Sequence, residues 1–180
     1  MTIETARLTL RPWRAADKPR FRYIINTPAM MIHFGGVAPD AQHDALIDAQ
    51  VVGEARYGFS MWAVDWRETG GLIGICGLRL AHHAASPVAG MLEIGWRIAE
   101  PFWRRGIARE AAAASLDWAW VNTRDDQAIA YTNLGNEPSW RLMQRLGMRR
   151  RVDLDFRHPR FAGDDPLGAM VVYSLDRPSA

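Results

Sequence analysis

The chain alternates between short segments with a two-residue hydrophobic period and longer segments with a helical period. In residues 6–13, Leu8 and Leu10 lie on one face and polar side chains lie on the other, which predicts a strand. Residues 91–99 alternate strictly between apolar and other side chains, and they predict a second strand of this kind. This period indicates strands with one buried face, because successive side chains of a strand point to opposite faces of the sheet.

The same criteria give the rest of the chain an α/β order. Residues 57–66 and 71–80 flank a turn sequence and predict an antiparallel hairpin. The further predicted strands are 128–134, 150–156 and 168–175. The predicted helical segments are an irregular one over 15–34 and three others over 40–56, about 107–121 and 136–148.

The helix predicted over 136–148 carries signals at both of its ends. Asn136 can cap its N-terminus, Pro138 suits its first turn, and Gly147 suits the position just past its C-terminus. Elsewhere the chain shows no internal repeat, low-complexity tract or linker. We therefore expect a single domain over residues 1–180.

Composition narrows the class of protein. The 180 residues are 48% apolar and 23% charged with a formal net charge of +2, which is ordinary for a globular protein and argues against a nucleic-acid partner. No apolar run reaches a membrane-spanning length, and the N-terminus does not resemble a secretion signal. The single cysteine, Cys76, excludes an internal disulfide and is expected to be a small core residue. We expect a cytoplasmic protein, a monomer or homodimer, that has no membrane partner.

Histidines do not indicate a metal site. None of the five has metal-ligand spacing to an acidic or thiol partner, so no metal is expected. His82 and His83 are expected in a solvated loop, whereas His158 is a candidate for contact with a substrate.

An unusual cluster of positive charge precedes the helix predicted over 107–121. Arg104, Arg105 and Arg109 lie at its start, where the helix dipole disfavours cations. Gly106 and Ala108 are small enough to let a ligand approach the backbone. The combination predicts an anion site at the helix N-terminus. A solvated loop with surface arginines is the alternative interpretation.

Four stretches together resemble one family. The stretches TARLTLRPW, MLEIGWRIAEPFW, RRGIAREA and NEPSWRLMQRLGM are similar, in content and order, to the Gcn5-related N-acetyltransferase (GNAT) superfamily and its bacterial RimJ/RimL-like branch. The resemblance spans about residues 4–176. The family's pyrophosphate loop is usually Q/R-x-x-G-x-G/A, and the chain departs from it only by Trp103 at the first position, which is common in this branch. The implied fold is a single mixed, mostly antiparallel sheet of six to seven strands with helices on both faces.

The resemblance implies acetyl-coenzyme A as cosubstrate. Backbone groups near Ile98 and Ala99 would pair with the pantetheine arm, and the loop would cradle the pyrophosphate. Asn136 would touch the pantetheine from the far side, or would serve only as a helix cap. The implied cofactor-binding residues are Ile98, Ala99, Trp103, Arg104, Arg105, Gly106, Ile107, Ala108, Arg109, Asn136 and Ser139.

Two residues are candidates for the chemistry. Glu93 lies where family members often place a glutamate and would deprotonate the acceptor amine; alternatively it pairs with an arginine across strands. Ser139 matches the serine that RimL-like enzymes place near the sulfur and would assist the leaving thiolate; alternatively it bonds its own helix backbone. Many members use a tyrosine in this helix, but the matching residue here is Met143.

The acceptor that the resemblance implies is a primary amine, either a protein N-terminal α-amine or a small-molecule amine. A lysine amine needs about 4–5 kcal/mol for deprotonation at pH 7, whereas an α-amine needs only about 1 kcal/mol. Trp62, Trp66 and His158 are candidates for the acceptor pocket, although a core position is the simpler expectation for the tryptophans. A non-catalytic acetyl-CoA sensor of the same fold is the alternative function.

Overall fold

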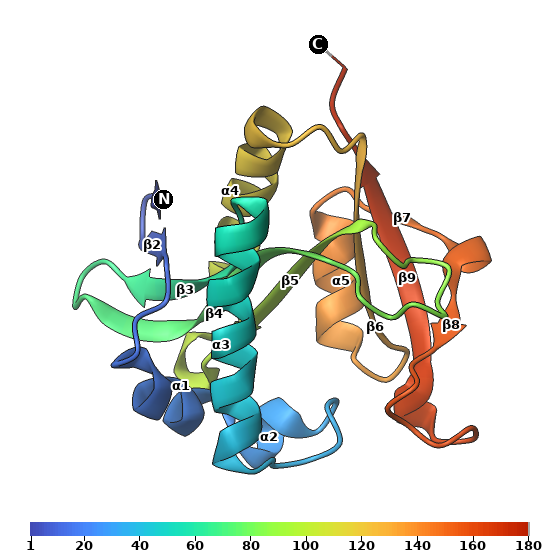
Figure 1. Cartoon of the computed structure of the whole chain (residues 1–180), viewed down its shortest axis with the longest axis horizontal. Helices are drawn as coiled ribbons and strands as arrows, with labels where there is room; N and C mark the ends of the chain where they lie inside the picture. Colours follow the sequence, from blue (N-terminus) through green and yellow to red (C-terminus); the bar gives the residue numbers. More distant parts are fainter. Residues whose placement is uncertain (180) are drawn as a thin grey trace. The chain divides into compact units, whose positions relative to one another are not determined.

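The computed structural model describes residues 1–179, which form two compact units (Figure 1). Unit 1 comprises Met1–Arg79 and Ile94–Trp118, and unit 2 comprises Leu80–Glu93 and the chain from Ala119 onward. Strand β5 (Leu92–Ile98) contributes its first two residues to unit 2 and the others to unit 1. The expectation of one domain over 1–180 stays a prediction.

In unit 1, neighbouring strands run antiparallel. Strand β1 (Ile3–Glu4) pairs with β2 (Leu8–Arg11), and β2 pairs with β3 (Met61–Trp66). Strand β3 in turn pairs with β4 (Gly71–Leu80), which confirms the predicted hairpin.

The helices of unit 1 follow the sequence pattern, with one interruption. The segment predicted over 15–34 divides into α1 (Asp17–Ile25) and α2 (Pro28–Met31). The break falls where Pro28 disfavours a helical conformation of the preceding Thr27, whose side chain then caps α2. The remaining elements are α3 (Asp40–Tyr57), the short 3₁₀ helix η1 (Glu100–Phe102) and α4 (Ile107–Asn122), whose last residues belong to unit 2.

Helices cover both faces of the β3–β4 hairpin, as predicted. Met61 and Ala63 share one hydrophobic cluster with apolar side chains of α1 and α3. On the opposite face, the ring of Trp62 meets the ring of Trp118 on α4 edge-on at 5.2 Å, and Cys76 lies 3.9 Å from Ser115. Trp62 is fully buried in this contact, so it belongs to the core.

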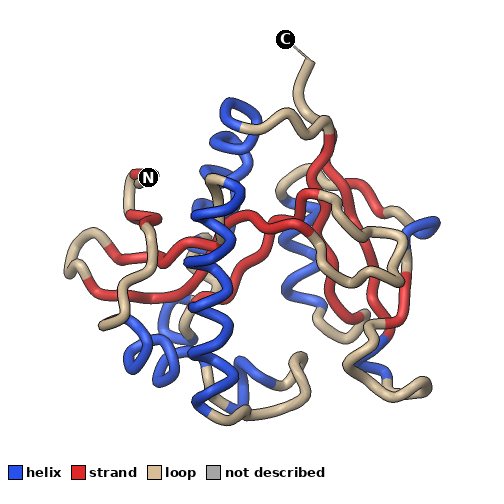
Figure 2. The backbone as a smooth tube through the Cα atoms, viewed as in Figure 1, coloured by secondary structure: helices blue, strands red, loops and turns tan. Residues whose placement is uncertain are grey.

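Unit 2 is built around the pair of strands β6 (Gln127–Asn133) and β9 (Ala169–Asp176), which are antiparallel (Figure 2). The start of β5 pairs in parallel with β6, and Leu92 and Glu93 lie opposite Ala128 and Ile129. The short strands β7 (Arg149–Arg150) and β8 (Phe156–Arg157) both pair with β9. Helix α5 (Glu137–Arg145) packs against β6 and β9.

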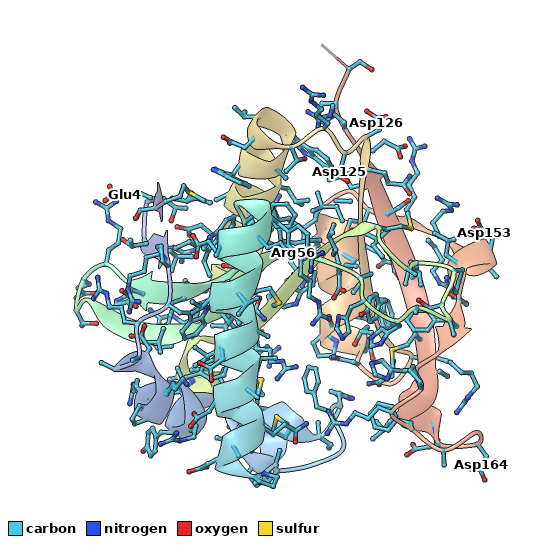
Figure 3. All side chains as sticks on the ribbon, in the orientation of Figure 1. Glu4, Arg56, Asp125, Asp126, Asp153 and Asp164 are labelled. Carbon is cyan, nitrogen blue, oxygen red and sulfur yellow. The ribbon has the colours of Figure 1, made fainter. Side chains whose placement is uncertain are left out.

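The prediction of one continuous strand over residues 150–156 was wrong. The structure breaks it into β7, the 3₁₀ helix η2 (Val152–Leu154, which contains the Asp153 labelled in Figure 3) and β8. A carboxylate oxygen of Asp155 accepts the backbone N–H of Val172 of β9, at 3.1 Å. This side chain therefore replaces a backbone acceptor in the ladder, and the chain between β7 and β8 leaves the sheet.

The strand count also needs correction. Residues 1–179 contain nine strands, not six to seven. Three of them, β1, β7 and β8, have two residues each, which is too short for a periodic pattern to reveal. The mixed, mostly antiparallel α/β character is confirmed. No helix within residues 1–179 combines the length and the apolar character that crossing a membrane requires.

The ends of α5 confirm two of three predicted signals. Pro138 lies in the first turn, and Gly147 adopts φ +84° just past the C-terminus. The N–H of Gly147 bonds the carbonyl of Gln144, and that of Met148 bonds the carbonyl of Met143, which closes the helix end. The predicted side-chain cap by Asn136 was wrong, because its amide nitrogen donates to Thr132 Oγ1 at 2.9 Å instead.

Candidate functional site

The loop between η1 and α4 has an unusual backbone. Arg104 has φ 59° and is the only non-glycine residue among residues 1–179 with a positive φ, and Gly106 follows with φ +75°. The sign of φ therefore alternates along residues 104–106, a backbone pattern typical of anion sites in which successive N–H groups face one concavity. The first N–H groups of α4, which follows directly, also lack partners inside the helix.

Within the protein, the conformation of Gly106 and not its packing is what favours glycine here. A Cβ added to it would have Arg7 Nη2 as its nearest neighbour, at 3.6 Å, which is ordinary contact. The positive φ, in contrast, is one that side-chain-bearing residues rarely adopt. The positive φ is thus a second reason for glycine at this position, and the close approach of a ligand to its backbone stays a prediction.

The N-terminal segment and α4 hold this loop together. Arg7 Nη1 donates to the carbonyl oxygen of Arg105 at 3.0 Å. Glu110, in the first turn of α4, accepts hydrogen bonds from the backbone N–H of Arg7, from Arg7 Nε and from Thr5 Oγ1, at 2.9, 2.7 and 2.6 Å. Burial opposes ionisation of Glu110, but the hydrogen bonds from Thr5 and Arg7 outweigh it and lower the pKa of this carboxyl.

The three arginines of the loop are exposed and, within residues 1–179, none has an ion-pair partner. The guanidinium of Arg105 lies over the rings of Trp66 and Phe102, at 5.3 and 5.4 Å from their centroids. Trp66 therefore positions a cation of the loop, a role that the sequence did not indicate. Arg104 and Arg109 leave their charge available to an anion.

The backbone groups expected to pair with pantetheine have partners inside unit 1. The N–H of Ala99 donates to the carbonyl of Ile73 at 2.8 Å, and the indole N–H of Trp103 donates to the carbonyl of Ile98. The Ala99 N–H is thus committed to the sheet. The Ile98 carbonyl accepts the indole N–H of Trp103, a side chain that is 42% exposed, and its pairing with pantetheine stays a prediction.

Glu93 lies in unit 2 and is only 4% exposed. It sits opposite Ile129 in the parallel ladder, so Glu93, Ile129 and Tyr131 share one face of the strands. Ile129 belongs to the hydrophobic cluster on that face, against which Tyr131 also packs. Glu93 is therefore a buried carboxylate on the face of the strands that carries this cluster.

An aromatic and imidazole cluster, made of His83, Tyr131, Phe156 and His158, packs on this same face. The ring centroids of His83 and His158 are 4.2 Å apart, and those of Tyr131 and Phe156 are 5.1 Å apart. His83 also contacts Tyr131, at 6.1 Å. His82 and His83 both lie in a loop, as predicted; His82 is exposed, whereas His83 is half-buried. Among residues 1–179, no group of three potential ligand side chains could hold a metal ion.

Asn136 and Ser139 lie at the start of α5, also in unit 2. Both are half-buried, and the N–H of Ser139 bonds the carbonyl of Asn136 at 3.1 Å. The Ser139 hydroxyl has no hydrogen bond to residues 1–179, so the alternative in which it bonds its own helix backbone is not observed. Met143, at the family's tyrosine position, is buried and cannot donate a proton.

Comparison with known proteins adds three findings. The uncharacterized protein YkkB of Bacillus subtilis is 29% identical over 147 residues, which are 81% of this chain and 84% of that protein. The solved structure of an acetyltransferase from Agrobacterium tumefaciens str. C58 is similar with a TM-score of 0.77 at 28% identity, over 97% of this chain and 94% of that one. RimL, a ribosomal L7/L12 α-N-protein acetyltransferase in complex with coenzyme A, shares the fold with a TM-score of 0.76 at 13% identity, over 98% of both chains.

A family model supplies the assignment. The model described as acetyltransferase (GNAT) domain matches residues 7–149, which include the loop before α4, Glu93 and Ser139. This match covers most of the chain, and the nine-stranded mixed α/β architecture agrees with it. The chain therefore belongs to the GNAT family of N-acetyltransferases.

Proposed function

We propose that the protein transfers the acetyl group of acetyl-CoA to a primary amine by direct attack within a ternary complex. One observation carries the proposal: the loop of residues 104–106 has alternating φ signs, leads into the N-terminus of α4, and bears cations without ion-pair partners in residues 1–179. This is the chemistry that a pyrophosphate requires, because backbone N–H groups and arginines both favour its negative charge.

The cosubstrate supplies an activated acetyl thioester. Backbone N–H groups of residues 105–108 would bind its pyrophosphate, and Arg104 and Arg109 would add charge-assisted bonds. Coenzyme A bound to RimL is consistent with this choice of ligand. The Ile98 carbonyl would accept an amide N–H of the pantetheine arm after the indole of Trp103 leaves it.

Glu93 is proposed as the base. The acceptor amine must be neutral to attack the thioester carbon, and Glu93 takes the proton from its ammonium form before the attack. The 4% exposure of Glu93 limits competition from water for this first proton. The second proton, which the nitrogen loses once the N–C bond has formed, passes to solvent. As the C–S bond breaks, the hydroxyl of Ser139 donates a hydrogen bond to the departing thiolate, which then takes a proton from solvent.

The acceptor is proposed to be a protein N-terminal α-amine or a small-molecule amine. An α-amine needs only about 1 kcal/mol for deprotonation at pH 7, so a modest base such as a carboxylate suffices. RimL, by its description, acts on the α-amine of a ribosomal protein, which supports the first option.

A thermal-shift titration followed by an amine panel tests the proposal. At 100 times its dissociation constant, acetyl-CoA adds about 2.7 kcal/mol to the stability of a protein that binds it in the folded state. A set of peptide N-termini and small amines is then assayed for release of free thiol. Binding without thiol release from any amine would favour the sensor, and an unchanged melting temperature would refute cofactor binding.

A further inference from the structure

Arg7 contacts the loop of residues 104–106 from a position far away in the sequence. Its Nη1 donates to the carbonyl oxygen of Arg105 at 3.0 Å, and its Nε pairs with Glu110 Oε2 at 2.7 Å. Its Nη2 is the nearest atom to the place that a Cβ on Gly106 would occupy. A single guanidinium therefore touches the middle of the loop and the first turn of α4.

The bond from Arg7 determines which way the loop presents its next N–H group. The peptide unit between Arg105 and Gly106 is planar and trans, so its C=O and N–H point in opposite directions. Because the Arg105 carbonyl is directed at Arg7, the N–H of Gly106 is directed to the other side of the loop. The side chain of Arg105, held over Trp66 and Phe102, restrains the same residue from its other end.

Glu110 restrains Arg7 in turn. Its carboxylate accepts from the backbone and the side chain of Arg7 and from Thr5, and these bonds lower its pKa, so it is ionised at neutral pH. The Arg7 side chain is 41% exposed and that of Glu110 18% exposed, so the pair itself contributes modestly to folding stability. Its geometric effect on the loop does not depend on that contribution.

We infer that Arg7 is a positioning residue for the cosubstrate: it holds the peptide between Arg105 and Gly106 so that the loop presents its N–H groups to the pyrophosphate. The inference rests on the proposed function of this loop. Arg7 acts through the loop backbone and not as a phosphate ligand. A lysine keeps the charge but provides a single compact donor, which cannot bridge the Arg105 carbonyl and the Glu110 carboxylate as a guanidinium does.

The experiment compares wild type, Arg7→Ala and Arg7→Lys. It measures the dissociation constant of coenzyme A by calorimetry, and KM and kcat for acetyl-CoA with one confirmed acceptor. For Arg7→Ala, the dissociation constant of coenzyme A and the KM for acetyl-CoA are both expected to rise about 10–100-fold, the usual effect of losing hydrogen bonds that involve a charged group. The kcat should change less than about twofold. Arg7→Lys should bind coenzyme A about as weakly as Arg7→Ala.

Arg67→Ala is the matched control. Arg67 is likewise an exposed arginine of unit 1 that bonds the N-terminal segment, through the Thr5 carbonyl at 2.6 Å and through Glu4, which Figure 3 labels. It makes none of the described contacts with residues 104–106. Its removal should leave the dissociation constant of coenzyme A at the wild-type value.

Distinct outcomes overturn the inference and the proposed function. Wild-type affinity in folded Arg7→Ala, whatever its melting temperature, overturns the positioning role. Full rescue by lysine also overturns it, because charge alone would then explain the effect. If Arg7→Ala does not fold, Glu110→Gln replaces it: an about 3–10-fold rise in the dissociation constant is expected, and no rise overturns the inference. Failure of wild type itself to bind coenzyme A refutes the proposed function instead.

Discussion

Gly106→Ala separates the conformation of the loop from the space around it. An added Cβ meets nothing closer than 3.6 Å, so the substitution adds no steric clash. The cost comes from φ +75°, which disfavours an L-residue by about 1–2 kcal/mol. A gain of about 0.4–1 kcal/mol from the stiffer unfolded chain offsets part of it. The net loss should be about 1 kcal/mol, or a melting temperature lower by about 2–4 °C for a chain of this size.

Gly58→Ala is the matched control for this strain. Gly58 ends α3 with φ +79° and has no atom within 4 Å of an added Cβ, so it should lose the same stability. Only Gly106→Ala, however, should weaken coenzyme A binding, by about 10-fold for one misdirected hydrogen bond to a charged ligand. Gly106→Asn should recover part of the affinity, because asparagine tolerates positive φ better than alanine.

Calorimetric titration of coenzyme A at 20 °C and thermal unfolding of the three variants measure both quantities. Equal losses of stability in Gly106→Ala and Gly58→Ala, accompanied by wild-type affinity in both, would refute the reasoning, since the backbone at residue 106 would then have no part in binding.

Three further perturbations test other parts of the structure. Glu93→Gln should lower turnover near neutral pH by about 10²–10⁴-fold, with a deficit that shrinks toward the pKa of the acceptor amine; parallel pH–rate profiles would exclude Glu93 as the base. Gly74→Ala would bring a Cβ to 2.3 Å from the carbonyl oxygen of Arg97, so it should lower the free energy of unfolding, measured in urea, by several kcal/mol. Gly71→Ala should lower it far less, and equal urea midpoints of the two variants would contradict the close approach of the strands at Gly74. Burial lowers the pKa of His43, so the unfolded chain binds the additional proton first, and stability should fall as the pH drops below about 6.5. His43→Met should flatten that dependence between pH 7.5 and 5.5, and an unchanged slope would show that other groups cause it.

Short-range physics explains what the sequence predicted well. The two-residue period located β2 and β5, because the alternation of side chains is a property of each strand alone. The turn sequence between residues 66 and 71 located the hairpin of β3 and β4. Pro138 and Gly147 located the ends of α5 because their backbone preferences are local. The anion loop was visible for the same reason, since its glycine and arginines are consecutive in the chain.

Contacts between distant segments were not visible in the sequence. The sequence predicted Asn136 as a helix cap, but its side-chain amide donates to Thr132 on the preceding strand. The strand predicted over 150–156 is interrupted, and the carboxylate of Asp155 accepts a backbone N–H of β9 there. His83 is a loop residue as predicted, but the sequence did not show that its ring contacts those of Tyr131 and His158.

The sequence by itself determined the family, the α/β order and the place of the loop proposed to bind the cosubstrate, whereas the tertiary structure decided how that loop is held. Arg7 and Glu110 are separated by 103 residues, and neither carries a local signal for the other. Their contact exists because the segment leading into β2 lies beside the start of α4, which no period or end signal encodes. Local preferences depend on a residue and its neighbours, but a hydrogen bond to a particular carbonyl depends on where the packed elements finally place both partners.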